Sequence, residues 1–385
     1  MPAPRHPDEG WIPVAFGALD VHGRTDFVDG AEILVVPCSP ADALCLVGEG
    51  AALWRRLVGR PPVPAVEFDD HDTAVLAQLG EAGLVVYARA HPAAVTRLDT
   101  PVLSSPLHEL VYALVQRVAV SRGIPCVFVK GPVLHHQSLR DREHSADVDV
   151  WCDPARWDEL VQALAPWGWT REPDPWWGTS VHHTATMVPS TWGCEIDVHR
   201  RFPGLTLDDD EAFAAVSAVT EPRVFAGTTV AVPRRGAHAV LSALHLMRPA
   251  VGTPTDDAAA RLAHEVLVRV PDAVENARGL GAVSALLEQL RAAFPGVDPG
   301  PVDGVPRDWR HRSQPDRAHA YLAALGTLPL RERARVLLRL IWPPDDIALA
   351  SARRAGETPA SARHARVRRL VRGVRSFHAT RGRRP

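Results

Sequence analysis

The sequence predicts a protein of the α+β or α/β class, with a central mixed sheet flanked by helices. Short apolar and alternating runs typical of strands recur up to about residue 200. Helical periodicities separate these runs and dominate from about residue 207 to about 342. We therefore expect a small N-terminal domain, a sheet-containing core, a helical C-terminal domain and a tail, at residues 11–90, 106–232, 233–345 and 351–385.

Composition limits the class of protein. Of the 385 residues, 46% are hydrophobic and 23% charged, which is enough to bury the cores of two or three domains. No apolar run approaches the roughly 18–20 residues of a membrane span, and the N-terminus lacks a signal sequence. The five cysteines include no C-x-x-C pair. We therefore expect reduced thiols in a cytoplasmic protein, with neither a disulfide framework nor a zinc site.

Positive charge concentrates in the tail. Residues 351–385 contain eleven arginines and one acidic residue, although the whole chain has a net charge of −2. Apolar residues of the tail recur at helical spacing, with arginines opposite them: Val367, Leu370, Val371, Val374 and Phe377. This pattern predicts a basic amphipathic helix. We expect it to dock onto the acidic body of the protein; an acidic peptide, nucleic acid or a membrane surface is the alternative partner.

The N-terminal domain combines short strands with two helices. Residues 11–37 predict two or three strands, and the segments around Leu53 and Leu76 predict two helices before a closing strand. This order is typical of a winged-helix-like module. Through "GEGAALWRRLVGR" and "AQLGEAGLVV" it resembles the RiPP recognition element, a small peptide-binding domain of ribosomal peptide biosynthesis. The resemblance implies that a leader peptide is captured as an added strand; a regulatory or packing domain is the alternative.

The predicted core alternates helices and strands. After a proline-containing linker at 88–105, a helix is expected at 106–121, then the buried strand "IPCVFV" and the short helix "GPVLHHQSL". "ADVDVWC" predicts another strand, and Asp153 caps a single helix extending to about residue 169. "VHHTATMV" and "CEIDVHRRF" predict two further strands joined by a turn.

Two of these strands carry acidic residues on one face. Because side chains two apart in a strand share a face, Asp147 and Asp149 lie together, with valines opposite. The later strand aligns Glu195, Asp197 and His199 in the same way. If the two strands are neighbours, three or four carboxylates converge; otherwise they form a solvated sheet face. Converging carboxylates suit Mg²⁺ and the two-metal chemistry of phosphoryl or nucleotidyl transfer.

The segments "VFVKGPVL", "DVDVW" and "CEIDVHRRF" together resemble the nucleotidyltransferase fold, in particular a bacterial family of uncharacterised nucleotidyltransferases. The resemblance covers about residues 106–250. It implies that Asp147, Asp149 and Asp197 are catalytic and hold Mg²⁺, with two ions expected. It also makes Asp197 the candidate base for an acceptor hydroxyl.

Lys130 is the only lysine among 43 basic residues, which favours a retained chemical role. Its ammonium suits triphosphate oxygens, and Gly131 would let the backbone approach the phosphates. The residues expected to bind an NTP, with ATP expected, are Lys130, Gly131, Arg140, Arg142 and His183. Pro132 departs from the family pattern because it has no N–H to offer a phosphate. Trp176 and Trp177 are candidates for stacking on a base or for anchoring their loop.

The sequence therefore predicts a Mg²⁺-dependent nucleotidyltransferase acting on a hydroxyl or phosphate of a peptide natural product or a small molecule. One alternative is an inactive scaffold that only binds a leader peptide. Another is a toxin-like enzyme that modifies tRNA or a protein hydroxyl, with the basic tail binding the acceptor.

Overall fold

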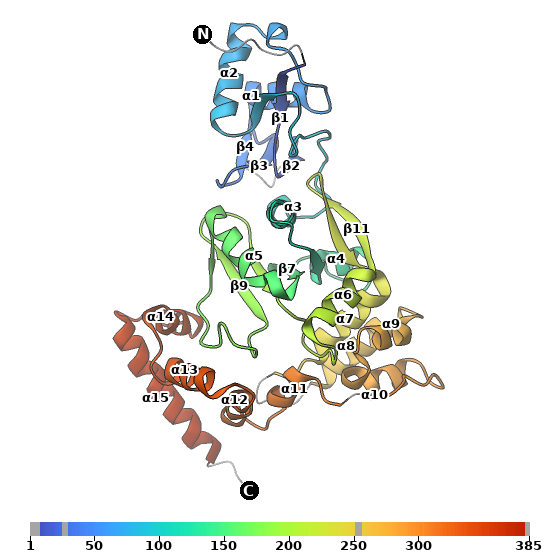
Figure 1. Cartoon of the computed structure of the whole chain (residues 1–385), viewed down its shortest axis with the longest axis vertical. Helices are drawn as coiled ribbons and strands as arrows, with labels where there is room; N and C mark the ends of the chain where they lie inside the picture. Colours follow the sequence, from blue (N-terminus) through green and yellow to red (C-terminus); the bar gives the residue numbers. More distant parts are fainter. Residues whose placement is uncertain (1–7, 25–29, 251–255, 303, 382–385) are drawn as a thin grey trace.

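The computed structural model describes residues 8–24, 30–250, 256–302 and 304–381, with side chains described as far as residue 372. Figure 1 shows the N-terminal strands and helices at one end of the molecule, the central sheet in the middle and the C-terminal helices at the other end. The predicted fold class is confirmed: the protein is α+β, with a central mixed sheet and many helices.

The N-terminal region has the predicted order of strands, helix, helix and closing strand. Its elements are β1 (Gly10–Pro13), β2 (Gly17–Asp20), β3 (Ile33–Val36), β4 (Leu44–Leu46), α1 (Gly48–Leu57), α2 (Asp70–Glu81) and β5 (Val85–Ala88). β1 pairs with β5, and β2, β3 and β4 form a second antiparallel sheet with β4 at one edge. Trp54 of α1 is fully buried, and its Nε1 donates to the carbonyl of Leu84 at 3.0 Å, which ties the helices to β5.

The central sheet has the strand order β6–β7–β10–β9–β8. Only the pair β7–β10 is parallel; the other neighbours are antiparallel. The core elements are α3 (Pro106–Ser121), β6 (Cys126–Val129), α4 (Gly131–His136), β7 (Asp147–Cys152), α5 (Trp157–Leu164), β8 (Trp169–Arg171), β9 (Thr184–Pro189), β10 (Glu195–His199) and α6 (Asp209–Ala218). α3 and α5 pack on one face of the sheet, and α6 and α7 (Arg235–Met247) pack on the other.

Two local predictions are wrong. The single helix expected from Asp153 is divided, because 3₁₀ turns at Pro154–Arg156 and Ala165–Trp167 flank α5. The helical interpretation of the chain after residue 207 misses the hairpin β11 (Thr220–Phe225) and β12 (Thr228–Pro233). The sequence "TTVAV" of β12 has the alternation of a strand, and the connecting Ala226 and Gly227 both adopt positive φ, as tight hairpin turns require.

The C-terminal helices are α8 (Asp257–Val268), α9 (Ala273–Gly279), α10 (Val283–Ala293), α11 (Arg307–Arg312), α12 (Arg317–Gly326), α13 (Leu330–Ile341), α14 (Asp345–Arg354) and α15 (Ala362–Arg381). α8, α9 and α10 share a core with α7. No helix in the described part of the chain is both long and apolar enough to span a bilayer.

The tail forms the predicted helix, α15, and packs against α14. Arg366 pairs with Asp345, and Arg354 pairs with Glu172 of the central region at 2.7 Å. These contacts tie the tail to acidic residues of the body. The side chains of Val374 and Phe377 lie outside the described residues.

Candidate active site

β7 and β10 are parallel neighbours, as convergence of the carboxylates requires. Their register places Asp149 opposite Asp197 and Asp147 opposite Glu195. The aliphatic side chains between these acids point to the other face and are fully buried in the core: Val148, Val150, Ile196 and Val198. The two-residue repeat of each strand therefore separates an apolar face from an acidic one.

Asp149 is the most enclosed of these acids, with 2% of its surface exposed. Its Oδ1 accepts from Lys130 Nζ at 2.5 Å and lies 2.7 Å from His199 Nε2. Burial by itself would raise the pKa of Asp149, but the charge of Lys130 and the hydrogen bond from His199 outweigh it and hold this pKa below its usual range. Asp149 is therefore ionised, and Lys130 is its counter-ion.

Two threonines of β9 form hydrogen bonds to the candidate metal ligands on β10. Thr186 Oγ1 donates to Asp197 Oδ1 at 2.7 Å, and Thr184 Oγ1 lies 2.8 Å from His199 Nδ1. Asp149, Asp197 and His199 each offer a ligand atom, and these three atoms lie within 4.8 Å of one another. Hydrogen bonds of this kind orient metal-binding side chains in proteins.

Asp147 lies on the same face but outside this group of three. It is half-buried, and Ser145 Oγ donates to its Oδ1 at 2.9 Å. Burial and the neighbouring charge of Asp149 raise its pKa. We name Asp147, Asp149 and Asp197 the Asp cluster. The sequence singled out its members, but it did not identify His199 as a candidate metal ligand, although His199 continues the alternation of Glu195 and Asp197.

The Lys130–Gly131 turn lies beside the Asp cluster. Both residues adopt positive φ, +60° and +58°, and a Cβ on Gly131 would lie 2.5 Å from the hydroxyl oxygen of Tyr112. The backbone N–H of Lys130 donates to His238 Nε2 at 2.7 Å, and His238 Nδ1 lies 2.7 Å from Gln137 Oε1. Glycine is therefore required here, and both the backbone N–H and the ammonium of Lys130 have a hydrogen-bond partner within the protein. Phosphate binding by this turn remains a prediction.

The two arginines predicted to contact phosphate have different positions. Arg140 is partly buried, and its guanidinium donates to the carbonyls of Arg142, Glu143 and His144 at 2.8, 2.8 and 3.2 Å. The side chain of Arg142 is exposed. Arg140 thus holds the loop before β7 in place, while Arg142 lies on the surface of that loop.

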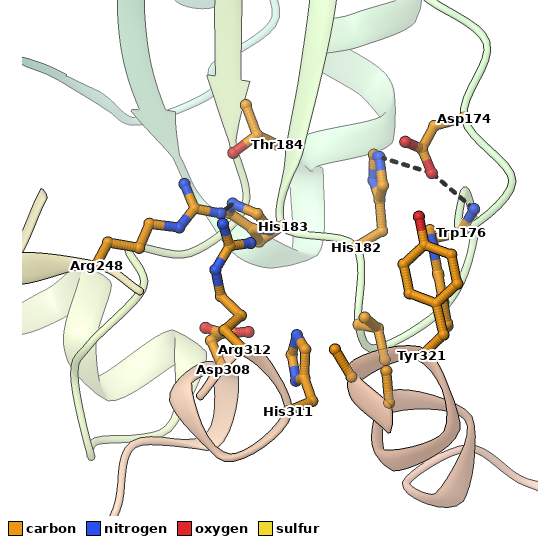
Figure 2. A pocket seen from close by; sticks show the side chains of 13 residues that line it. Asp174, Trp176, His182, His183, Thr184, Arg248, Asp308, His311, Arg312 and Tyr321 are labelled. Carbon is orange, nitrogen blue, oxygen red and sulfur yellow. Dashed lines mark hydrogen bonds and ion pairs between the residues drawn. The ribbon is translucent and has the colours of Figure 1, made fainter. Parts of the chain in front are cut away.

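The fifth predicted nucleotide-binding residue, His183, lines a pocket of about 200 Å³ on the β9 side of the Asp cluster. We call it the arginine pocket. Figure 2 shows its charged and aromatic lining, which comes from the segment before β9, the end of α7, and helices α11 and α12: Asp174, Trp176, His182, His183, Thr184, Arg248, Asp308, His311, Arg312 and Tyr321. Thr184 joins the pocket to the site, since it also contacts His199.

The two tryptophans of the 173–179 loop have separate environments. Trp176 lines the arginine pocket, and its ring meets Tyr321 edge-on at 5.7 Å. Trp177 packs against Trp157 at 4.6 Å, with the guanidinium of Arg171 at 3.9 Å over its ring. Trp177 therefore anchors the loop to the core, and Trp176 is the one that faces the pocket.

No protein-family model and no curated protein matches the chain. Among solved structures, the antibiotic-resistance factor ANT(2'')-Ia aligns with 16% identity over 48% of this chain and 93% of its own, at a TM-score of 0.30. An antigenic nucleotidyltransferase-like protein from Paracoccidioides brasiliensis aligns with 16% identity over 50% and 94%, at 0.32. The nucleotidyltransferase toxin MenT4 from Mycobacterium tuberculosis aligns with 15% identity over 60% and 88%, at 0.25. At these identities and TM-scores the matches assign neither reaction nor substrate, so the chemistry has to be inferred from the site.

Proposed function

We propose that the protein is a Mg²⁺-dependent nucleotidyltransferase. It would move a nucleotidyl group from an NTP, ATP being expected, to a hydroxyl or phosphate of a peptide natural product or a small molecule. The observation that supports this proposal is the register of Asp149 and Asp197 on adjacent parallel strands, with a lysine beside them.

The donor set of the Asp cluster fits a hard divalent cation. Lys130 and His199 both contact the same oxygen of Asp149, Oδ1. Thr186 donates a hydrogen bond to Oδ1 of Asp197. Among the described residues, no hydrogen bond occupies the Oδ2 atom of either aspartate. Two carboxylate oxygens on neighbouring strands thus remain available, and oxygen is the ligand that Mg²⁺ prefers. Asp149 and Asp197 would hold the ion, with Asp147 and His199 beside them.

The side chains around the Asp cluster have separate roles in this proposal. Bound Mg²⁺ would neutralise charge on the phosphate oxygens. Asp197 accepts the proton of the acceptor hydroxyl, whose oxygen then bonds to the α-phosphorus as the bond to pyrophosphate breaks. Thr186 holds the Asp197 carboxylate in one orientation. Lys130 keeps Asp149 ionised, and its positive charge favours the anionic substrate.

Calorimetric titration of each of the four NTPs with Mg²⁺ tests the proposal. Asp197→Asn retains an acceptor for Thr186 and removes one charge, so we expect the affinity for one Mg²⁺–NTP to fall at least 10-fold, about 1.4 kcal/mol. Glu195→Gln is the matched control, because Glu195 lies on the same face of β10 but is exposed. If no NTP binds the wild-type protein, or if Asp197→Asn binds as tightly as wild type, the proposed function is wrong.

We further propose that the N-terminal region binds the leader segment of a peptide substrate. β4 is the edge strand of the β2–β3–β4 sheet and is only three residues long. Its outer side would accept a peptide strand through backbone hydrogen bonds. Hydrogen exchange tests this: a bound precursor peptide should protect backbone amides of Leu44–Leu46, and unchanged exchange with every candidate peptide would contradict it.

A further inference from the structure

The arginine pocket contains two arginines whose hydrogen-bonding capacity is largely unused. Arg248 Nη2 donates to His183 Nε2 at 2.6 Å, but its Nε is buried and has no hydrogen-bond partner among the residues that the structure describes. Arg312 Nε donates to the carbonyl of Pro249 at 2.8 Å, while its two terminal nitrogens have no hydrogen bond among the described residues. Figure 2 shows the guanidinium groups of both arginines beside His183. Two guanidinium groups therefore lie in one pocket, and within the described residues their hydrogen bonds go only to neutral acceptors.

The acidic residues of the pocket do not neutralise this charge. Asp308 is buried and binds Arg201 in a two-pronged pair, with distances of 3.1 and 2.7 Å. Asp174 accepts the backbone N–H of Trp176 at 2.7 Å. In the described part of the chain, neither Arg248 nor Arg312 forms an ion pair with a carboxylate. The two guanidinium groups of the pocket thus have no ion-pair partner among these residues, while the carboxylate of Asp174 lies beside His182 and Trp176.

Titration of the neighbouring groups does not remove these charges near neutral pH. Burial and the proximity of Arg312 lower the pKa of Arg248 to about 10, which still leaves it protonated. Burial, together with the charge of Arg248, holds the pKa of His183 well below its usual range. His183 is therefore neutral and serves as the acceptor that orients Arg248. Burial also lowers the pKa of His311 on the same wall, so His311 adds no positive charge at pH 7.

The pocket lies on the opposite side of the Asp cluster from Lys130. In the strand order β6–β7–β10–β9, Lys130 follows β6, the two aspartates lie on β7 and β10, and His183 precedes β9. Helix α7 runs from the Lys130 side to the arginine pocket: His238 contacts Lys130, and Arg248 lies at the C-terminal end of the helix. Ten residues of helix correspond to about 15 Å. In-line transfer requires donor and acceptor on opposite sides of the transferred phosphorus.

We propose that the arginine pocket binds the acceptor substrate and that this acceptor carries a phosphate monoester. The inference rests on the proposed function and names its substrate class. A phosphate monoester has a charge near −2 at neutral pH, which matches two guanidinium groups, whereas a carboxylate matches one. Trp176 and Tyr321 supply an aromatic wall for the rest of the acceptor.

Inorganic phosphate is the probe for this site. We expect 10 mM phosphate, roughly the concentration a weak single-anion site needs, to raise the melting temperature of the wild-type protein above that in chloride of equal ionic strength. Arg312→Gln should abolish the increase. Arg310→Gln is the matched control, since Arg310 lies on the same helix but is exposed, and it should keep the increase. Acetate, a monoanion, should produce a smaller increase than phosphate.

Mg²⁺–NTP titration of the same variants separates the two proposals. If Arg312→Gln loses the phosphate effect but binds Mg²⁺–NTP within about twofold of wild type, the acceptor assignment is supported. If it loses both, the pocket holds the triphosphate of the NTP, and the assignment to the acceptor is wrong. If phosphate raises the melting temperatures of wild type and Arg312→Gln equally, or raises neither, the assignment of a phosphate site to this pocket is wrong. If no NTP binds wild type, the acceptor role fails together with the proposed function, whatever phosphate does.

Discussion

On the β6 side of the Asp cluster, Lys130 Nζ lies 2.5 Å from Asp149, and the backbone N–H of Lys130 is bound by His238. On the β9 side, Arg248 and Arg312 line one pocket, and neither forms an ion pair with a carboxylate of the described residues. The Lys130 ammonium on the first side is thus paired with a carboxylate, whereas the two guanidinium groups of the second side have no such partner among the described residues. The difference indicates that the Lys130 side is built for stability and preorganisation, and that the arginine pocket is built to receive an anion.

The largest expected effect is on the Lys130 side. Asp149→Asn removes the counter-ion of a lysine whose side chain is 13% exposed. Breaking such a pair leaves a buried charge uncompensated, so we expect the free energy of unfolding in urea to fall by about 4 kcal/mol. Lys130→Met in the same background should recover part of this loss. Asp141→Asn, at a 95% exposed position, is the control and should change little. If Asp149→Asn left the free energy of unfolding unchanged, the two sides would not differ in their contribution to stability.

Gly131→Ala tests whether the Lys130 turn is held rigidly. The positive φ of this position and the contact of the new Cβ with Tyr112 should together reduce the free energy of unfolding by about 2–3 kcal/mol. Gly123→Ala is the control for the backbone alone, because Gly123 has a φ of +64° with open space around it. Tyr112→Phe should recover part of the loss only at Gly131. Equal losses at the two glycines would show that the contact with Tyr112 has no effect.

The pH dependence of stability tests the Lys130 side, where His238 accepts the backbone N–H of Lys130. Burial lowers the pKa of His238 to about 3 and of His108 to about 4, against 6.5 for the unfolded chain. The unfolded state therefore binds protons that the folded state does not, and stability present above pH 6.5 is lost as the pH falls from 6.5 toward 4. Each histidine contributes about 1.4 kcal/mol per pH unit in this window. Urea denaturation from pH 7 to pH 4.5 measures how the free energy of unfolding changes with pH. His238→Gln should reduce this slope by the contribution of one histidine.

The smallest effect is expected on the β9 side. Arg312→Gln removes a cation that repels Arg248 and that forms no ion pair with a carboxylate in the described part of the chain, so the free energy of unfolding should change by less than about 0.5 kcal/mol or increase slightly. Urea denaturation without phosphate measures this. A loss above about 2 kcal/mol, of the size found on the Lys130 side, would mean that Arg312 is a structural partner after all.

Local pattern predicted much of the fold. The helix at Pro106–Ser121, the strands around Asp147 and Glu195, and the two helices of the N-terminal region follow from periodicity, capping and turn residues. The hairpin formed by β11 and β12 was missed because the helical patterns on either side of it are longer than its two short strands. The division of the helix after Asp153 was missed because the two 3₁₀ turns flank α5 directly, and their residues fit the same helical pattern in the sequence.

The sequence by itself determined which face of each strand is acidic, since that depends only on a two-residue repeat, and it marked Lys130 by its rarity. The tertiary structure decided that β7 and β10 are parallel neighbours, so that Asp149 lies opposite Asp197 and contacts His199, which is 50 residues away in the sequence. It also brought together Arg248 and Arg312, which no sequence pattern singled out among the 42 arginines. Strand neighbours and pocket walls arise from packing between distant segments, which no local repeat encodes.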